Sequence, residues 1–215
     1  MAQWTLTDYA EQHTTTVCEV AEQLFRWAHL NTAQPQMLCG RAEGRLLSML
    51  CQTLGAKCVV EVGAFVGYST LWLADGVGAD GIVNSFEIND EYEGIIRSTF
   101  ARAGYSERLR LHIGDAVTGI PEWFDTQKPV VDFAFIDAGK RQNRTFYDLL
   151  LPRVRRGGMI AIDNVLWGGK VLDIDNCNDL DTRLVRGFND YVNSDSRVEN
   201  TMLTIRDGLM LCRVV

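Results

Sequence analysis

The sequence predicts an α/β protein with a mostly parallel sheet, an antiparallel hairpin at its C-terminal end and a helical N-terminal preface. Three observations carry this prediction. The first quarter of the 215 residues shows helical periodicity and no strand pattern. Short apolar runs then alternate with helical windows, as in a parallel sheet with crossover helices on both faces. Two final apolar runs are separated by an Asp-Gly turn, which is typical of a hairpin.

The preface is predicted to contain two helices. Asp8 and Glu11 predict the start of a helix that runs to about Asn31, before a break at an Ala-Gln-Pro sequence. A second helix over Arg41–Leu54 places leucines on one face and stops at Gly55. Such helices pack on the sheet, cover a site or form a subunit contact, and the sequence leaves these alternatives open.

The remaining elements follow from apolar runs and helical windows between turn residues. Parallel strands are expected at Cys58–Val62, Ile82–Glu87, Leu109–Ile113, Val131–Ile136 and Met159–Ile162. Helices are expected at Tyr68–Leu73, Glu91–Ala103, Ala116–Trp123, Arg144–Leu151 and Leu180–Val192. The hairpin strands are Val198–Ile205 and Leu209–Val214, split by Arg206-Asp207-Gly208. An antiparallel partner at the C-terminal end separates this pattern from a purely parallel doubly wound fold.

Length and composition indicate an ordinary globular chain, with 47% hydrophobic and 23% charged residues. We expect one domain over residues 1–215, made of the preface (1–55) and an α/β core (56–215). The net charge of −7 and the lack of long basic runs exclude nucleic acid as the expected partner.

The N-terminus has no signal-peptide pattern and no window approaches 18 apolar residues, so we expect a cytoplasmic protein without a membrane span. The six cysteines lack C-x-x-C spacing and are expected to be reduced thiols. The three histidines lack the spacing of zinc ligands.

Two apolar runs, Val130–Ile136 and Met159–Ile162, each end in a carboxylate, Asp137 and Asp163. If the runs form neighbouring parallel strands, their ends lie roughly 4.8 Å apart. Two carboxylates that close repel each other unless a cation lies between them. Asn164 adds an amide oxygen, and this donor set suits Mg²⁺ or Ca²⁺ better than zinc.

Lys140 follows Asp137 by three residues, so a helical turn would place its amine near that acid. Because neighbouring strand residues point to opposite faces, the strand must end at or before Asp163 if Asp163 and Asn164 are to reach one ion. Two plainer interpretations stay open. Asp163 and Asn164 would cap the next turn, and Lys140 would be a solvated lysine at a helix start.

A second group of residues resembles a nucleotide-binding corner. The segment Glu61–Ser69 closes the first strand and opens a helix, and Gly63 and Gly67 allow a tight turn and close ligand approach. Glu87 ends the next strand, where a carboxylate can accept hydrogen bonds from ribose hydroxyls. Gly114–Ala116 follows the third strand at the same edge. Each feature alone suits an ordinary turn, but three successive strand ends together indicate a ligand.

Six motifs occur in order over essentially the whole chain. They are E-V-G-x-F-x-G-Y-S at 61–69, the acid at 87, G-D-A at 114–116, I-D-A-x-K at 136–140, G-G-x-I-x-x-D-N at 157–164 and L-W-x-G-x-V at 166–171. Together they resemble the cation-dependent O-methyltransferases, the group of catechol and caffeoyl-CoA O-methyltransferases. The resemblance implies a Rossmann-like seven-stranded sheet, S-adenosylmethionine over the first strands, and a homodimer.

The resemblance also implies a role for each matching residue. The cofactor-binding residues would be Glu61, Gly63, Gly67, Tyr68, Ser69, Glu87, Ile88, Asp115, Ala116 and Asp137. The metal, with Mg²⁺ expected and Ca²⁺ or Mn²⁺ as alternatives, would be held by Asp137, Asp163 and Asn164. Lys140 would be the base, and Met37, Lys140, Asn164 and Trp167 would contact the acceptor. The chain departs from the pattern at Gly139, where many relatives have Asp, and at Asn143, where Tyr is common.

The implied reaction transfers a methyl group from S-adenosylmethionine to one hydroxyl of a vicinal dihydroxy aromatic. Lys140, beside a cation, would lose its proton more easily and accept the phenolic proton. An NAD-linked oxidoreductase is one rival, but Ala64 and Phe65 interrupt the G-x-G-x-x-G fingerprint. A non-catalytic adenosylmethionine-binding protein is another, and it would not need Lys140.

Some candidate acceptor contacts have a plain structural alternative. Trp167 would line the acceptor pocket or pack a loop. Met37, Trp4 and Tyr9 would form a lid over the acceptor, but helix-core packing is the expected role of each.

Overall fold

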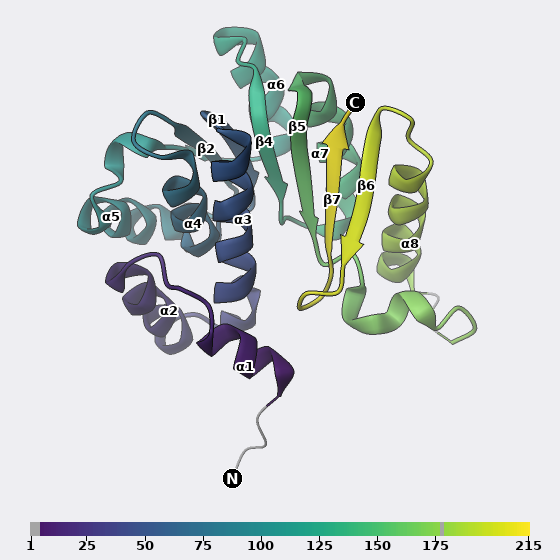
Figure 1. Ribbon diagram of the computed structural model, residues 1–215, viewed down its shortest axis with the longest axis horizontal. Coiled ribbons are helices and arrows are strands. Elements are labelled where there is room, and N and C mark those ends of the chain that lie inside the picture. The colour runs from purple at the N-terminus through teal and green to yellow at the C-terminus, as the bar shows by residue number, and fades with distance from the viewer. Residues whose placement is uncertain (1–4, 177–178) are drawn as a thin grey trace.

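The computed structural model describes residues 5–176 and 179–215, so Trp4 and Cys177 lie outside the described residues (Figure 1). Its centre is a seven-stranded sheet with the order β3-β2-β1-β4-β5-β7-β6. The first five strands pair in parallel, and β7 runs antiparallel to both β5 and β6. The predicted Rossmann-like, mostly parallel sheet with a C-terminal hairpin is confirmed.

The elements lie close to their predicted positions. The strands are β1 (Cys58–Val62), β2 (Ile82–Glu87), β3 (Leu109–Ile113), β4 (Val131–Ile136), β5 (Val154–Asp163), β6 (Val198–Leu203) and β7 (Leu209–Val214). The α-helices are α1 (Leu6–Gln12), α2 (Glu19–Asn31), α3 (Arg41–Leu54), α4 (Tyr68–Val77), α5 (Glu93–Ala103), α6 (Ala116–Gln127), α7 (Asn143–Leu150) and α8 (Leu180–Asn193). Short 3₁₀ turns include η1 (Pro35–Met37), η2 (Asp90–Tyr92), η4 (Lys140–Gln142) and η6 (Trp167–Leu172).

The core lies on both faces of the sheet because successive strand residues point to opposite sides. In β1, Val59 packs in a cluster with residues of α2 to α5, whereas Val60 and Val62 pack in a second cluster with residues of α6 to α8. The central strands therefore consist almost entirely of buried residues. Among the described residues, no helix has the length and apolar character needed to cross a membrane.

The preface differs from the prediction in one respect. The single helix expected up to Asn31 is two helices, α1 and α2, separated by a stretch that contains Thr14, Thr15 and Thr16. Threonine disfavours helix because it is β-branched and its hydroxyl bonds the local backbone. The hydroxyl of Thr14 donates a hydrogen bond to the backbone carbonyl of Ala10 at 2.7 Å.

The cap of the first helix also differs. Thr5 is the N-cap of α1 and forms a capping box with Asp8: its Oγ1 accepts from the Asp8 N–H at 3.1 Å, and the Asp8 carboxylate accepts from the Thr5 N–H at 2.9 Å. Glu11 instead reaches α3, where its carboxylate accepts from the backbone N–H groups of Arg41 at 2.6 Å and Ala42 at 3.1 Å. The glycine N-cap of α3 has no side chain, so Glu11 satisfies these otherwise free donors from a distance.

Several helices and strands are longer or shorter than predicted. Strand β5 begins at Val154 rather than Met159, and α4 continues to Val77. Strand β6 ends at Leu203. The helix expected from Glu91 begins as the 3₁₀ turn η2 before α5. None of these changes moves a predicted site residue to another edge of the sheet.

The topology places all five parallel carboxyl ends at one edge. Strands β4 and β5 are neighbours, so the residues that follow them lie side by side. The turn between β6 and β7 lies at this same edge (Figure 1). This is the edge at which open α/β sheets bind their ligands.

A buried carboxylate holds β1, β2 and α4 together. Glu61 is fully buried, and its oxygens accept hydrogen bonds from Ser69 at 2.6 Å, Thr70 at 2.6 Å and Ser85 at 2.5 Å. Burial raises the pKa of Glu61 to about 7, although the three hydroxyl donors favour the charged form. Glu61 therefore has a structural role: it links β1, β2 and α4 beneath the carboxyl edge of the sheet.

Replacing Glu61 with Gln should lower the free energy of unfolding by about 2–4 kcal/mol, because three buried hydroxyls can no longer all donate to one acceptor group. The native pKa of about 7 exceeds the ordinary value of 4.5, so wild-type stability should fall as pH rises between these values. The variant should lose that part of the slope.

Urea denaturation at pH 4.5, 6 and 8 would measure both effects. Glu107→Ala, which removes an exposed acid, is the control. An unchanged stability and pH slope in the Gln variant would contradict the structural role of Glu61.

Candidate active site

One cavity of about 720 Å³ lies at the carboxyl edge of the sheet. Its wall combines the turn after β1, the ends of β2 and β3, the residues after β4 and β5, and the segment 33–39 before α3. The two groups of residues singled out in the sequence therefore line the same cavity. We describe them as the glycine corner (residues 63–69, 87–88 and 114–116) and the acid corner (Asp137, Lys140, Asp163 and Asn164).

The glycine corner depends on Gly63. Its φ is +96°, and a Cβ at this position would lie 2.1 Å from the carbonyl oxygen of Asp137. Gly67 has φ +87° and is the N-cap of α4, whose first residues Tyr68 and Ser69 line the cavity. Glu61 does not line the cavity, because its carboxylate is turned into the hydroxyl cluster below.

Glu87 lies at the end of β2 and faces the cavity with an exposed fraction of 7%. Its carboxylate accepts from the backbone N–H groups of Phe65 at 2.6 Å and Asn89 at 2.9 Å, which fixes its position. The neighbouring Ile88 is 73% exposed and forms an apolar part of the rim. Together they offer an acid and an apolar surface at the place predicted for a nucleoside.

The turn after β3 completes the glycine corner. Asp115 caps α6 by accepting from the Val117 N–H at 2.9 Å, and Ala116 follows it along the cavity wall. The predicted positions 63, 68, 69, 87, 88, 115 and 116 thus line one cavity. Gly67 and Glu61 do not line it: Gly67 caps α4, and a Cβ at Gly67 would face Ile96.

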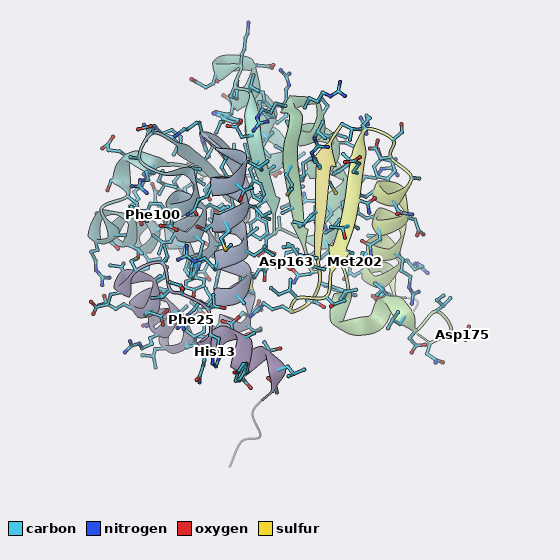
Figure 2. All side chains as sticks on the ribbon, viewed as in Figure 1. His13, Phe25, Phe100, Asp163, Asp175 and Met202 are labelled. Atoms are coloured by element: carbon cyan, nitrogen blue, oxygen red, sulfur yellow. The ribbon has the colours of Figure 1, made fainter. Side chains whose placement is uncertain are left out.

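The acid corner has the geometry that the strand ends predict. The Nζ atom of Lys140 lies 3.2 Å from Oδ1 of Asp137, and both side chains are largely buried, with exposed fractions of 10% and 17%. The 3₁₀ turn η4 brings the lysine back over the acid. Asp163 ends β5 at the same edge, where Figure 2 shows it at the lower end of the strand.

Strand β5 ends at Asp163, which is the condition stated above for Asp163 and Asn164 to reach one ion. Asn164 has φ +59°, a left-handed conformation that Asn tolerates better than most residues, so the chain leaves the strand directly after Asp163. Oδ1 of Asp163 accepts from the Asn164 N–H at 2.6 Å. Both residues line the cavity.

Electrostatics at this corner favour a cation. Burial, followed by the negative charge of Asp137, raises the pKa of Asp163 to about 7. Asp137, Asp163 and Asn164 all line the cavity, and two carboxylates with an amide oxygen are the donor types that a hard divalent ion prefers. Among the described residues, no three His, Cys, Asp or Glu side chains cluster as a metal site, and the predicted set includes only two acids.

The loop after Asn164 is held by the hairpin between β6 and β7. The carboxylate of Asp207 accepts from the Gly168 N–H at 2.5 Å, and its carbonyl accepts from the Leu166 N–H at 2.9 Å. Trp167 lies between these contacts with φ +50° and lines the cavity. Met37 also lines the cavity and is 51% exposed, so it is not a helix-core residue. Tyr9, at 57% exposed, is not one either.

The two departures from the family pattern have different surroundings. Gly139 begins η4, and a Cβ there would meet only the tip of Gln142 at 3.8 Å, so the position has room for a side chain. Asn143 is 1% exposed, and its Oδ1 has no hydrogen-bond partner.

Among the residues that sequence reasoning missed at this site are two charged ones, Arg206 in the cavity wall and Glu43 behind it. Arg206 lines the cavity, donates to the Leu38 carbonyl at 2.9 Å and lies 3.5 Å from Glu43. Glu43 is fully buried, and burial, with Asp163 and Asp137, raises its pKa well above the ordinary value. The signal was present: Glu43 shares the buried face of α3 with Leu47 and Cys51 at i+4 spacing.

The comparisons with known proteins identify the family of the chain. The model of a family described as O-methyltransferase matches residues 11–215. A probable caffeoyl-CoA O-methyltransferase of Dictyostelium discoideum is 33% identical over 95% of this chain and 89% of its own length. A caffeoyl-CoA O-methyltransferase of Populus kitakamiensis is 37% identical over 80% of this chain and 75% of its own.

Solved structures give the same answer for the fold. The O-methyltransferase TomG of Streptomyces achromogenes, in complex with SAM, has a TM-score of 0.88 at 27% identity and covers 96% of this chain and 94% of its own. A Bacillus cereus O-methyltransferase in complex with SAH has the same TM-score and identity, with 98% and 97% covered.

Fold, cavity and comparisons define a methyltransferase. The chain belongs to the O-methyltransferase family and is an S-adenosylmethionine-dependent O-methyltransferase. Membership of this enzyme family excludes the two alternatives that the sequence left open, an NAD-linked oxidoreductase and a non-catalytic adenosylmethionine-binding protein.

Replacing Gly63 with Ala should destabilise the protein by about 3 kcal/mol or more, because the new methyl group overlaps a backbone oxygen that cannot move away cheaply. Gly55→Ala is the matched control. Gly55 also has positive φ, but nothing lies within 4 Å of its added Cβ. The control should cost only the left-handed strain of about 1–2 kcal/mol. Equal losses in urea denaturation would show that the close approach to Asp137 is unimportant.

Proposed function

We propose that this O-methyltransferase transfers a methyl group from S-adenosylmethionine to one hydroxyl of a vicinal dihydroxy aromatic acceptor, with a divalent cation at the acid corner. One observation supports this proposal above the others. A single cavity joins the glycine corner to the acid corner, so a nucleoside-type donor and an acidic, lysine-containing site face the same space.

The glycine corner suits the donor. The two structural relatives described above, both at 27% identity, were solved in complex with SAM and SAH. In this chain Gly63 and Gly67 keep the backbone open beside the methionine part, Glu87 accepts from the ribose hydroxyls, and Asp115 and Ala116 border the adenine. Ile88 covers the rim of the same corner.

The acid corner suits the acceptor. The names of the curated relatives specify caffeoyl-CoA, and a caffeoyl group carries two adjacent phenolic hydroxyls. Asp137, Asp163 and Asn164 supply the oxygen ligands for a cation, which when bound would stabilise a phenolate oxygen as a Lewis acid. Mg²⁺ is the expected ion, and Ca²⁺ or Mn²⁺ suits the same oxygens.

Lys140 is the general base of the proposed reaction. Its amine is held by Asp137 at 3.2 Å and is 10% exposed, so it is fixed in the cavity and shielded from bulk water. In the neutral form it accepts the proton of the acceptor hydroxyl, and the oxygen then attacks the methyl carbon of the sulfonium. The carbon–sulfur bond breaks as the carbon–oxygen bond forms, and the neutral thioether S-adenosylhomocysteine leaves. Trp167 and Met37, which both line the cavity, contact the aromatic ring.

We also propose that the protein acts as a homodimer in the cytoplasm. Leu6, Tyr9 and Leu30 are exposed apolar side chains of the preface, and they support a contact through α1 and α2. Light scattering on the purified chain measures this state directly. A monomeric mass at micromolar concentration would contradict it.

Replacing Lys140 with Met should lower kcat at least about 100-fold, because the general base is lost while the length of the side chain is kept. Affinity for S-adenosylmethionine should stay within a factor of about two. Turnover of a caffeoyl thioester or a small catechol, followed with labelled methyl donor, measures the first quantity, and calorimetry measures the second. Lys128→Met, at an exposed lysine, is the control. Native turnover in the Lys140 variant would remove the base from the mechanism.

Removing divalent ions with excess EDTA should abolish methyl transfer, and Mg²⁺ or Mn²⁺ added beyond the chelator should restore it. Asp163→Asn should prevent the restoration at the same ion concentration, because a negative ligand is replaced by a neutral one. Binding of the methyl donor should survive both treatments. Undiminished turnover in EDTA would remove the cation from the proposed function.

A further inference from the structure

One charged residue near the cavity is not explained by packing. Glu43, on α3, has no exposed surface, and neither carboxylate oxygen has a hydrogen-bond partner among the described residues. Its nearest cationic atom is Nε of Arg206, 3.5 Å from Oε2. Burying a carboxylate without hydrogen bonds is costly, so such a group is rarely kept for stability alone.

A structural ion pair in the same preface looks different. Arg41 and Glu22 meet at 2.8 Å, and the guanidinium of Arg41 contacts both carboxylate oxygens. Both partners keep about a quarter of their side-chain surface in solvent, at 28% and 26%. Glu43 and Arg206 have a longer contact, no hydrogen bond between them, and a fully buried acid.

Glu43 lies beside the acid corner. Asp163 and Asp137 are close enough to act on its charge, and Arg206, its partner, lines the cavity together with Asp163 and Asn164. The local charges are then three carboxylates (Glu43, Asp137 and Asp163) against two cations (Lys140 and Arg206). When all three carboxyl groups are ionised, the group carries one excess negative charge, which a bound cation would offset.

The carboxylate of Glu43 acts at a distance and not as a ligand. It does not line the cavity, and no three acids in the described ranges 5–176 and 179–215 cluster as metal ligands. In a poorly solvated region the field of a charge extends well beyond contact distance. The positive guanidinium of Arg206 stands on the cavity side of the pair and opposes that field.

We propose that Glu43 is a third negative charge of the cation site, which raises divalent-ion affinity through its field, and that Arg206 lowers the same affinity. The proposal rests on the cation of the proposed function. It makes the helical preface, which supplies no cation ligand, a contributor to ion binding.

The two residues should therefore shift ion affinity in opposite directions. Glu43→Gln, which keeps shape and removes the charge, should weaken Mn²⁺ binding at least about fivefold. Arg206→Met, which keeps most of the side-chain length, should strengthen it by a similar factor. Glu43→Asp, which keeps the charge, should stay nearer to the wild type than the Gln variant.

The experiment is a titration of the full-length protein with Mn²⁺, in which electron paramagnetic resonance counts free ion without substrate or turnover. Glu22→Gln is the matched control, because it neutralises an acid of an ion pair in the same preface that does not line the cavity. The control should change thermal stability and leave the Mn²⁺ dissociation constant unchanged. Thermal unfolding of every variant separates folding defects from affinity.

The outcomes distinguish the two proposals. A wild-type chain that binds no Mn²⁺ would overturn the cation site and this inference with it. A wild type that binds, with a Glu43→Gln variant that binds equally well, would overturn this inference alone. Weaker binding in both Glu43→Gln and Arg206→Met would also overturn it, because a structural pair loses affinity from either side. If Glu43→Gln fails to fold, Arg206→Met decides: tighter binding supports the proposal, and unchanged or weaker binding overturns it.

Discussion

The close approach of two strand ends is the constraint on which the site depends. The N–H of Asp137 donates to the Val62 carbonyl at 2.9 Å, and the carbonyl of Asp137 occupies the space that a side chain at position 63 would fill. The first turn of the donor side and the first acid of the acceptor side are thereby held against each other by backbone alone. A nucleoside bound above β1 is then beside whatever binds at the end of β4, without any side chain having to move.

Two buried glutamates show how differently one residue type is used. Glu61 is surrounded by three hydroxyl donors and fixes the strands and helix beneath the cavity. Glu43 has no such donors and faces other acids and an arginine. Burial raises the pKa of both, but only the first is compensated by hydrogen bonds. The difference separates a carboxylate that holds the fold from one that shapes the charge of a site.

Most of the sheet and much of the site followed from the sequence, because apolar runs bounded by Gly and Asp mark both the strands and their carboxyl ends. Asp137 with Lys140, and Asp163 with Asn164, are local pairs whose geometry depends on turns of a few residues. The contacts that were missed join distant parts of the chain. Glu11 reaches Arg41 across 30 positions, and Arg206 reaches Leu38 across 168. The break between α1 and α2 was missed because the apolar positions that predicted the helix all lie after the threonines, from Val17 to Ala28, and were extended back to Asp8 although threonine favours non-helical backbone.

The way the walls are built bears on how such an enzyme acquires new acceptors. The donor side is formed by strand ends and helix starts, where one added methyl group at Gly63 would collide with backbone. The proposed acceptor side consists of η1, the Trp167 loop and the tip of the β6–β7 hairpin, which are joined by hydrogen bonds of Asp207 and Arg206. Insertions and exchanges in these three segments leave the sheet intact. A lineage with this architecture can therefore diversify what it methylates while its source of methyl groups stays the same.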